Sequence, residues 1–141
     1  MFKVYWQGYG GTKYLAEEMR SLIENLGMSL TTISEWQDSN IIWDKNTWLQ
    51  ELSKADILIL PLNYQIQDAK SNNRLTQYCA LGKPVICSPL PAYVRIIEKY
   101  NCALIASNQE EFKQHLQNFY ILLLFPNCHT VSSNNKDIQF Y

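Results

Sequence analysis

The sequence predicts an α/β protein: a three-layer structure with an open parallel sheet of about five strands between helices. Short apolar runs of strand length alternate with amphipathic stretches of helix length, the order expected of βαβ units. Two of the runs, residues 55–60 and 84–87, are apolar apart from Asp56, as in strands that helices cover on both faces. Right-handed crossovers are expected to join successive strands.

Composition predicts one globular domain over residues 1–119 and an irregular tail over residues 120–141. The chain has 141 residues, of which 47% are hydrophobic and 18% charged, so it can bury a core. Its net charge of −1 provides no basic field for nucleic acid. The four cysteines lack C-x-x-C spacing, which favours a reducing compartment.

No secretory signal precedes the first apolar run, and no run approaches the ~20 residues of a membrane-spanning helix. We therefore expect a cytoplasmic protein that reaches a membrane only through a partner. Cys128 and His129 are adjacent but lack further ligands nearby, so no metal site is expected.

The first strand is predicted at residues 2–7, which are rich in aromatic and β-branched side chains. A glycine-rich turn at residues 8–12 and an amphipathic helix at residues 13–26 follow. This order is typical of phosphate binding, although the third glycine of G-x-G-x-x-G is missing. Two interpretations of Gly10 and Gly11 stay open: contact with a phosphate or sugar, or a plain tight turn.

The next part of the chain predicts a strand at residues 29–34, a loop at residues 35–46 and a short helix at residues 47–54. Trp36 and Trp43 lie in the loop and are interpreted first as sealing the edge of the core. The apolar run that follows is expected to be a central strand. Polar residues crowd the loop after it, which is where a ligand should bind.

A helix, a strand and a rigid loop follow in close succession. Ser71 can cap a helix over about residues 72–81, and Gly82 ends that helix. Residues 84–87 form the next buried strand. A loop, a helix start and a strand end that meet in an α/β sheet form a binding crevice.

The polar side chains of this helix predict an anion site. Asn73, Arg74 and Gln77 share one face, and Lys70 lies just before the first turn. A helix N-terminus favours phosphate, and the two cations would add formal charge there. The alternative is that these residues form the solvated face of an amphipathic helix.

The remaining elements are helices at residues 93–100 and 109–119 and a strand at residues 103–106. Tyr93, at the start of its helix, either reaches the crevice or packs as a core aromatic. Residues 120–125 are an apolar run, predicted to be a strand-like, aggregation-prone patch in a chain truncated or frame-altered after about residue 119.

Residues 80–86, Ala-Leu-Gly-Lys-Pro-Val-Ile, follow a helix and precede a short loop and another helix. This segment resembles the carboxyl-terminal half of GT-B glycosyltransferases of the group 1 type. The resemblance covers about residues 2–119, and residues 56–62 fit the strand before the family's donor loop. It implies a Rossmann-like domain that binds a nucleotide sugar, with the first loop near the donor and Trp36 available to stack on the base.

The chain departs from this family at two positions. Many retaining members carry two glutamates separated by seven residues, and Ala69 and Gln77 stand at the corresponding positions here. Gln77 can still bond a ribose hydroxyl, but without the extra strength of a charged acceptor. The resemblance implies that Lys70 and Arg74 neutralise the diphosphate. The predicted donor-binding residues are Lys70, Asn73, Arg74, Gln77, Gly10, Gly11 and Tyr93.

The sequence offers no nucleophile–base pair and no pair of carboxylates at the crevice. We therefore expect the donor-binding half of a glycosyltransferase, inactive without an acceptor domain and with no catalytic residue, metal or cofactor of its own. Two alternatives remain open. One is a stand-alone N-glycosyl hydrolase or transferase that acts on nucleosides through Asp68. The other is a non-catalytic module that pairs with a separate acceptor-domain chain.

Overall fold

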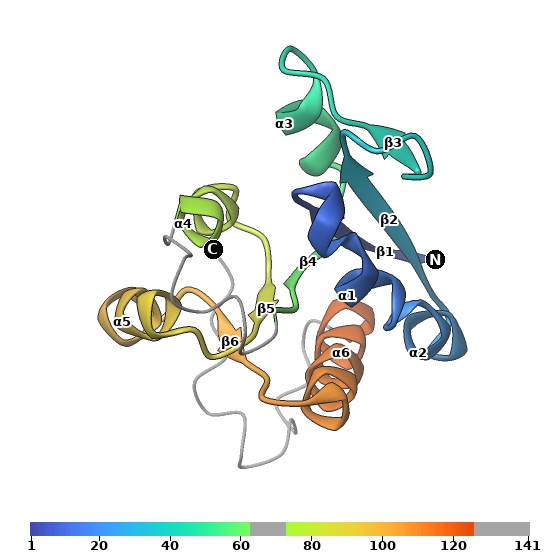
Figure 1. The fold of residues 1–141 in the computed structure, drawn as a ribbon. Coiled ribbons are helices and arrows are strands. Elements are labelled where there is room, and N and C mark those ends of the chain that lie inside the picture. The colour runs from blue at the N-terminus through green and yellow to red at the C-terminus, as the bar shows by residue number, and fades with distance from the viewer. Residues whose placement is uncertain (63–72, 126–141) are drawn as a thin grey trace.

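A computed structural model describes residues 1–62 and 73–125 and has the predicted α/β architecture (Figure 1). Its sheet holds six strands in the order β3-β2-β1-β4-β5-β6, and every neighbouring pair is parallel. The strands are β1 (Phe2–Gln7), β2 (Met28–Ser34), β3 (Ile41–Ile42), β4 (Ile57–Leu60), β5 (Val85–Cys87) and β6 (Leu104–Ile105).

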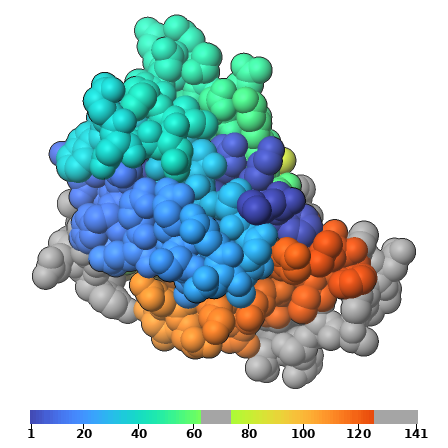
Figure 2. All heavy atoms as spheres, turned by 90° about the vertical axis from the view of Figure 1, so that its right-hand side faces the viewer, coloured from blue at the N-terminus to red at the C-terminus, as the bar shows by residue number. Residues whose placement is uncertain are grey.

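Helices cover both faces of the sheet and complete a three-layer, Rossmann-like fold (Figure 1). One face carries α1 (Lys13–Glu17), α2 (Arg20–Asn25) and α6 (Gln109–Leu124); a 3-10 turn, η1 (Gly10–Thr12), precedes α1. The other face carries α3 (Trp48–Leu52), α4 (Asn73–Ala80) and α5 (Pro91–Tyr100). Figure 2 shows α1 and α2 beside α6.

The central strands supply both layers of core because successive side chains of a strand point to opposite faces. Ile57 and Ile59 of β4 belong to the cluster beneath α1, α2 and α6. Leu58 and Leu60 belong to the cluster beneath α3, α4 and α5. All four side chains are at most 1% exposed, which explains why this strand reads as one continuous apolar run.

The sheet is built outwards from β1 in two directions: β2 and β3 lie on one side of it, and β4, β5 and β6 lie on the other. β1 pairs with β2 on one side and with β4 on the other, where Val4 lies opposite Ile57. Strand order therefore reverses between β1 and β4, and in open α/β sheets the crevice for a ligand lies outside the carboxyl ends of the strands at such a switch point.

Three predicted elements differ from the structure. β3 falls within the predicted loop, because a two-residue edge strand is too short to show a period. The predicted helix at residues 13–26 is divided into α1 and α2, and η1 lies within the predicted turn that precedes it. At the break between the two α-helices, the N–H of Met19 donates to the carbonyl of Ala16, an i→i−3 bond.

The third difference concerns the predicted strand-like patch after residue 119, which was wrong for residues 120–124. The helix α6 continues to Leu124. The Tyr120 ring packs edge-to-face against Phe2 with 5.1 Å between centroids, and Leu122 and Leu123 pack partly buried on the first core. Core contacts therefore hold this apolar run in a helix. Within the described ranges, no helix has the length and apolar character needed to cross a bilayer.

Candidate functional site

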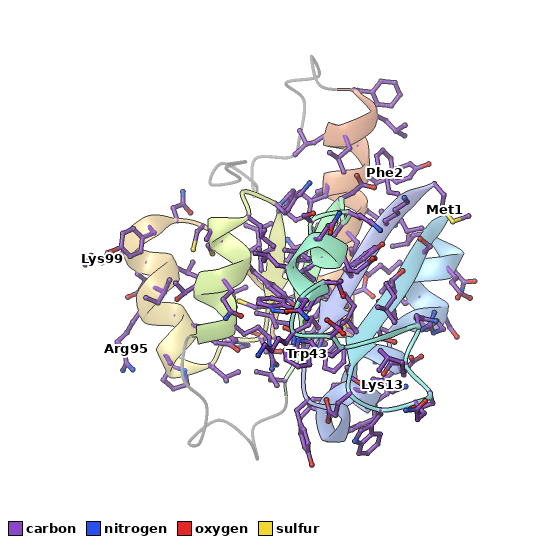
Figure 3. The ribbon with its side chains drawn as sticks, turned by 90° about the horizontal axis from the view of Figure 1, so that it is seen from above. Met1, Phe2, Lys13, Trp43, Arg95 and Lys99 are labelled. Atoms are coloured by element: carbon purple, nitrogen blue, oxygen red, sulfur yellow. The ribbon has the colours of Figure 1, made fainter. Side chains whose placement is uncertain are left out.

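The candidate site lies at the carboxyl ends of β1 and β4, where the strand order reverses. Figure 3 shows Lys13 and Trp43 near this end of the sheet, opposite the end that holds Phe2. Gly8 follows β1, and its N–H donates to the carbonyl of Ile33 at 3.0 Å. At this end of the sheet, the first residue after β1 is thus a glycine that is hydrogen-bonded to β2.

Arg74 brings a positive charge to this edge from the first turn of α4. A β-carbon placed on Gly8 would lie 2.9 Å from Arg74 Nη1 and 2.6 Å from Trp6 Cζ2. The guanidinium thus approaches the backbone of Gly8 closely, and a larger residue at position 8 would meet both side chains. None of the ion pairs within residues 1–62 and 73–125 involves Arg74.

Two buried tyrosines lie within electrostatic range of Arg74. Tyr78 is on the same helix, one turn later, and Tyr93 is on α5; both are at most 1% exposed. Burial raises the pKa of both phenols, and the charge of Arg74 partly opposes that rise. Both hydroxyls therefore stay neutral and add no negative charge beside the guanidinium.

The structure brings only some of the predicted residues together. It places Arg74 and Tyr93 near each other, although the Tyr93 side chain packs in the second core. Gln77 is exposed on the surface of α4. Asn73 begins α4, and its side chain lies outside the described part of the structure, as do Lys70 and the alternative candidate Asp68.

Gly10 and Gly11 lie beneath two aromatic rings. The Trp36 indole packs against Gly10 and the Tyr9 ring against Gly11, each so closely that a β-carbon would collide. The Gly10 N–H donates to Glu35 Oε1 at 2.8 Å. Packing thus accounts for both glycines, and a carboxylate of the chain itself already bonds the N–H that a phosphate would use.

Positive charge at the glycine-rich turn is also paired within the chain. Lys13 is buried, with Nζ 3.2 Å from Asp38 Oδ2 and 3.5 Å from Glu17 Oε1. A hydrogen bond from Arg20, with help from Lys13, lowers the pKa of Glu17. The turn therefore carries more carboxylates than unpaired cations, whereas Arg74, beside Gly8, takes part in none of the ion pairs among the described residues.

Sequence reasoning missed Gly8, Tyr78 and Glu35. Gly8 follows the first strand directly, so its position was a usable signal. Tyr78 stands four residues after Arg74 and therefore on the same helix face. Glu35 stands directly after β2, where dinucleotide-binding doubly wound folds place a carboxylate that binds ribose.

The described residues include no cluster of three or more metal-ligating side chains. Cys79, Cys87 and Cys102 are free thiols, and burial raises the pKa of Cys79 and Cys87. The thiols of Cys79 and Cys87 are thus neutral at physiological pH and lack the thiolate character that nucleophiles need.

No protein-family model and no curated protein matches this chain. The functional conclusion therefore rests on the geometry at the ends of β1 and β4.

Proposed function

We propose that this chain binds a nucleotide sugar through its diphosphate and serves as the donor-binding half of a glycosyltransferase. The observation that carries the proposal is the position of Arg74. Its guanidinium lies against the Gly8 backbone at the switch point of the sheet, and no ion pair among the described residues involves it.

The chemistry of Arg74 suits a diphosphate. A guanidinium presents several N–H donors in a planar fork and keeps its charge at every physiological pH. Hydrogen bonds between such a group and phosphate oxygens are about twice as strong as neutral ones. The buried phenols of Tyr78 and Tyr93 reduce the screening of this charge by water. In sugar transfer the diphosphate is the leaving group, so the same contact would stabilise the charge that develops on it.

The resemblance of residues 80–86 to group 1 GT-B enzymes adds the substrate class to this geometry. On that reading the acceptor and the catalytic base come from another domain, supplied by a separate chain or by a longer protein. The donor-binding residues proposed beside Arg74 are Lys70, Asn73, Gln77 and Tyr93, and no metal takes part. Gly10 and Gly11 would lie on the donor side of the site, beneath the rings of Trp36 and Tyr9 that cover them.

Isothermal titration calorimetry with UDP-glucose and GDP-mannose tests the proposal. We expect one of them to bind the wild-type chain, and Arg74→Ala to weaken that binding by about tenfold or more, the effect of losing a charged hydrogen-bond donor. Arg95→Ala is the matched control, because Arg95 is exposed on α5 and points away from the sheet (Figure 3). Absence of binding to both sugars, or equal affinities of the Arg74→Ala and wild-type proteins with intact circular dichroism, would overturn it.

A further inference from the structure

Glu35 is fixed at the end of β2 and remains open to solvent. Its Oε1 accepts the Gly10 N–H at 2.8 Å, and no hydrogen bond or ion pair of the described residues involves Oε2. The side chain is exposed. One oxygen of this carboxylate thus holds it in position, while the other can accept a hydrogen bond from a ligand.

An aromatic surface lies beside this carboxylate. The Trp36 indole packs over Gly10 yet remains 47% exposed. Glu35 and Trp36 therefore both contact Gly10. The carboxylate can accept hydrogen bonds from hydroxyl groups, and the exposed indole can stack on a flat ring. These are the two kinds of contact that a nucleoside offers.

Local charge favours a neutral group at Glu35. Lys13 is already paired with Glu17 and Asp38, so the turn supplies carboxylates and no unpaired cation. A phosphate would be repelled here, whereas a sugar hydroxyl donates to a carboxylate without penalty.

The phosphate position lies close by. Gly8, beside Arg74, and Gly10, beside Glu35, are two residues apart, which limits their Cα atoms to roughly 7 Å. The cation and the carboxylate thus contact neighbouring parts of one short loop, as groups that bind a ribose and its attached phosphates would.

We propose that Glu35 binds the ribose hydroxyls of the donor, which makes the donor a ribonucleoside diphosphate sugar and not a deoxyribonucleoside one. This inference rests on the proposed function and deepens it. In dinucleotide-binding sheets with this strand order, an acidic residue about 20 residues beyond the glycine-rich turn bonds the ribose 2′-hydroxyl, and Glu35 stands at a comparable distance beyond Gly10. Glu35 provides the charged acceptor that the exposed Gln77 lacks.

Calorimetry of the full chain with UDP, GDP, dUDP and dGDP tests this inference. In the wild-type protein we expect the ribonucleotide to bind about tenfold more tightly than its 2′-deoxy counterpart, because a hydrogen bond to a charged acceptor is lost. Glu35→Gln keeps an oxygen for the Gly10 N–H and removes the charge, so this preference should shrink to about twofold or less. Asp38→Asn removes a charge from the same loop and should keep the preference.

The two proposals fail in different ways. Equal binding of ribo and deoxy forms by the wild-type protein would overturn the role of Glu35, and this comparison needs no variant. An unchanged preference in Glu35→Gln, or its equal loss in Asp38→Asn, would also overturn it. In these cases binding that depends on Arg74 would leave the proposed function intact. Absence of binding to every nucleotide would overturn both proposals.

Discussion

The hydroxyl of Tyr78 bonds both backbone groups of Gln7, a residue 71 positions earlier in the chain. It accepts the Gln7 N–H at 2.9 Å and donates to the Gln7 carbonyl at 3.3 Å. Gln7 is the last residue of β1, and Tyr78 is fully buried on α4, one turn after Arg74. This pair of hydrogen bonds therefore fixes α4 to the end of β1 and places the guanidinium beside Gly8.

Replacing Tyr78 by phenylalanine tests this anchor. The ring would still fill the core, but the N–H and carbonyl of Gln7 would lose their partner in a partly buried place. We expect the free energy of unfolding to fall by about 1–3 kcal/mol, the usual cost of leaving such groups unsatisfied. Chemical denaturation measures this change.

The control for Tyr78→Phe is Tyr9→Phe. The Tyr9 side chain is 59% exposed, and its ring contact with Gly11 survives the loss of the hydroxyl. We expect its unfolding free energy to change by no more than about 0.5 kcal/mol. Equal stabilities of Tyr78→Phe and wild type would show that these hydrogen bonds do not hold α4 in place.

The buried thiol of Cys87 predicts a loss of stability in alkali. Cys87 is 0% exposed in β5, and burial raises its pKa above the ordinary value. Above about pH 8.5 the unfolded chain therefore releases a proton that the folded chain retains. The unfolding free energy should fall as pH rises from there, by up to about 1.4 kcal/mol per pH unit for this group.

Denaturation from pH 7 to 10 in reducing buffer, with wild type and Cys87→Ala, measures this effect. The variant starts less stable because it leaves a small cavity, but its decline with pH should be shallower. The pKa of Cys79 is also raised, so this residue contributes to the decline of unfolding free energy with pH in both proteins. Identical slopes for the two proteins would contradict the assignment to Cys87.

Sequence periodicity predicted the architecture well where elements are long or fully buried. The run at residues 55–60 predicted the central strand β4 because both faces of that strand are covered. The edge strand β3 is two residues long and has no period to detect. The end of α6 depends on contacts such as Tyr120 with Phe2, which join opposite ends of the described chain and leave no local signal.

The site was predictable in part for the same reason. Arg74 was predicted from a local pattern on one helix, and the structure places it in the first turn of α4. Its close approach to Gly8 depends on how α4 packs against β1, which spacing along the sequence does not fix. The bond between Gly10 and Glu35 likewise spans 25 residues. Gly10 and Gly11 were noticed as ligand candidates, whereas aromatic packing explains why both are glycine.

Gly8→Ala tests whether the contact between β1 and Arg74 serves binding. The new β-carbon would lie 2.6 Å from Trp6 Cζ2 and 2.9 Å from Arg74 Nη1, so the indole or the guanidinium must move. We expect a stability loss of about 1–3 kcal/mol from overpacking, together with weaker binding of UDP or GDP in calorimetry.

Gly27→Ala separates these two effects. Gly27 has a φ of +79°, so alanine there costs about 1–2 kcal/mol of backbone strain, yet no atom lies within 4 Å of the added carbon. It follows α2, on the face of the sheet opposite α4. Both variants should therefore lose stability, but only Gly8→Ala should lose nucleotide affinity, because only its new methyl group meets the guanidinium. Nucleotide affinity that falls equally in both variants would mean that lower stability, and not the position of Arg74, weakens binding.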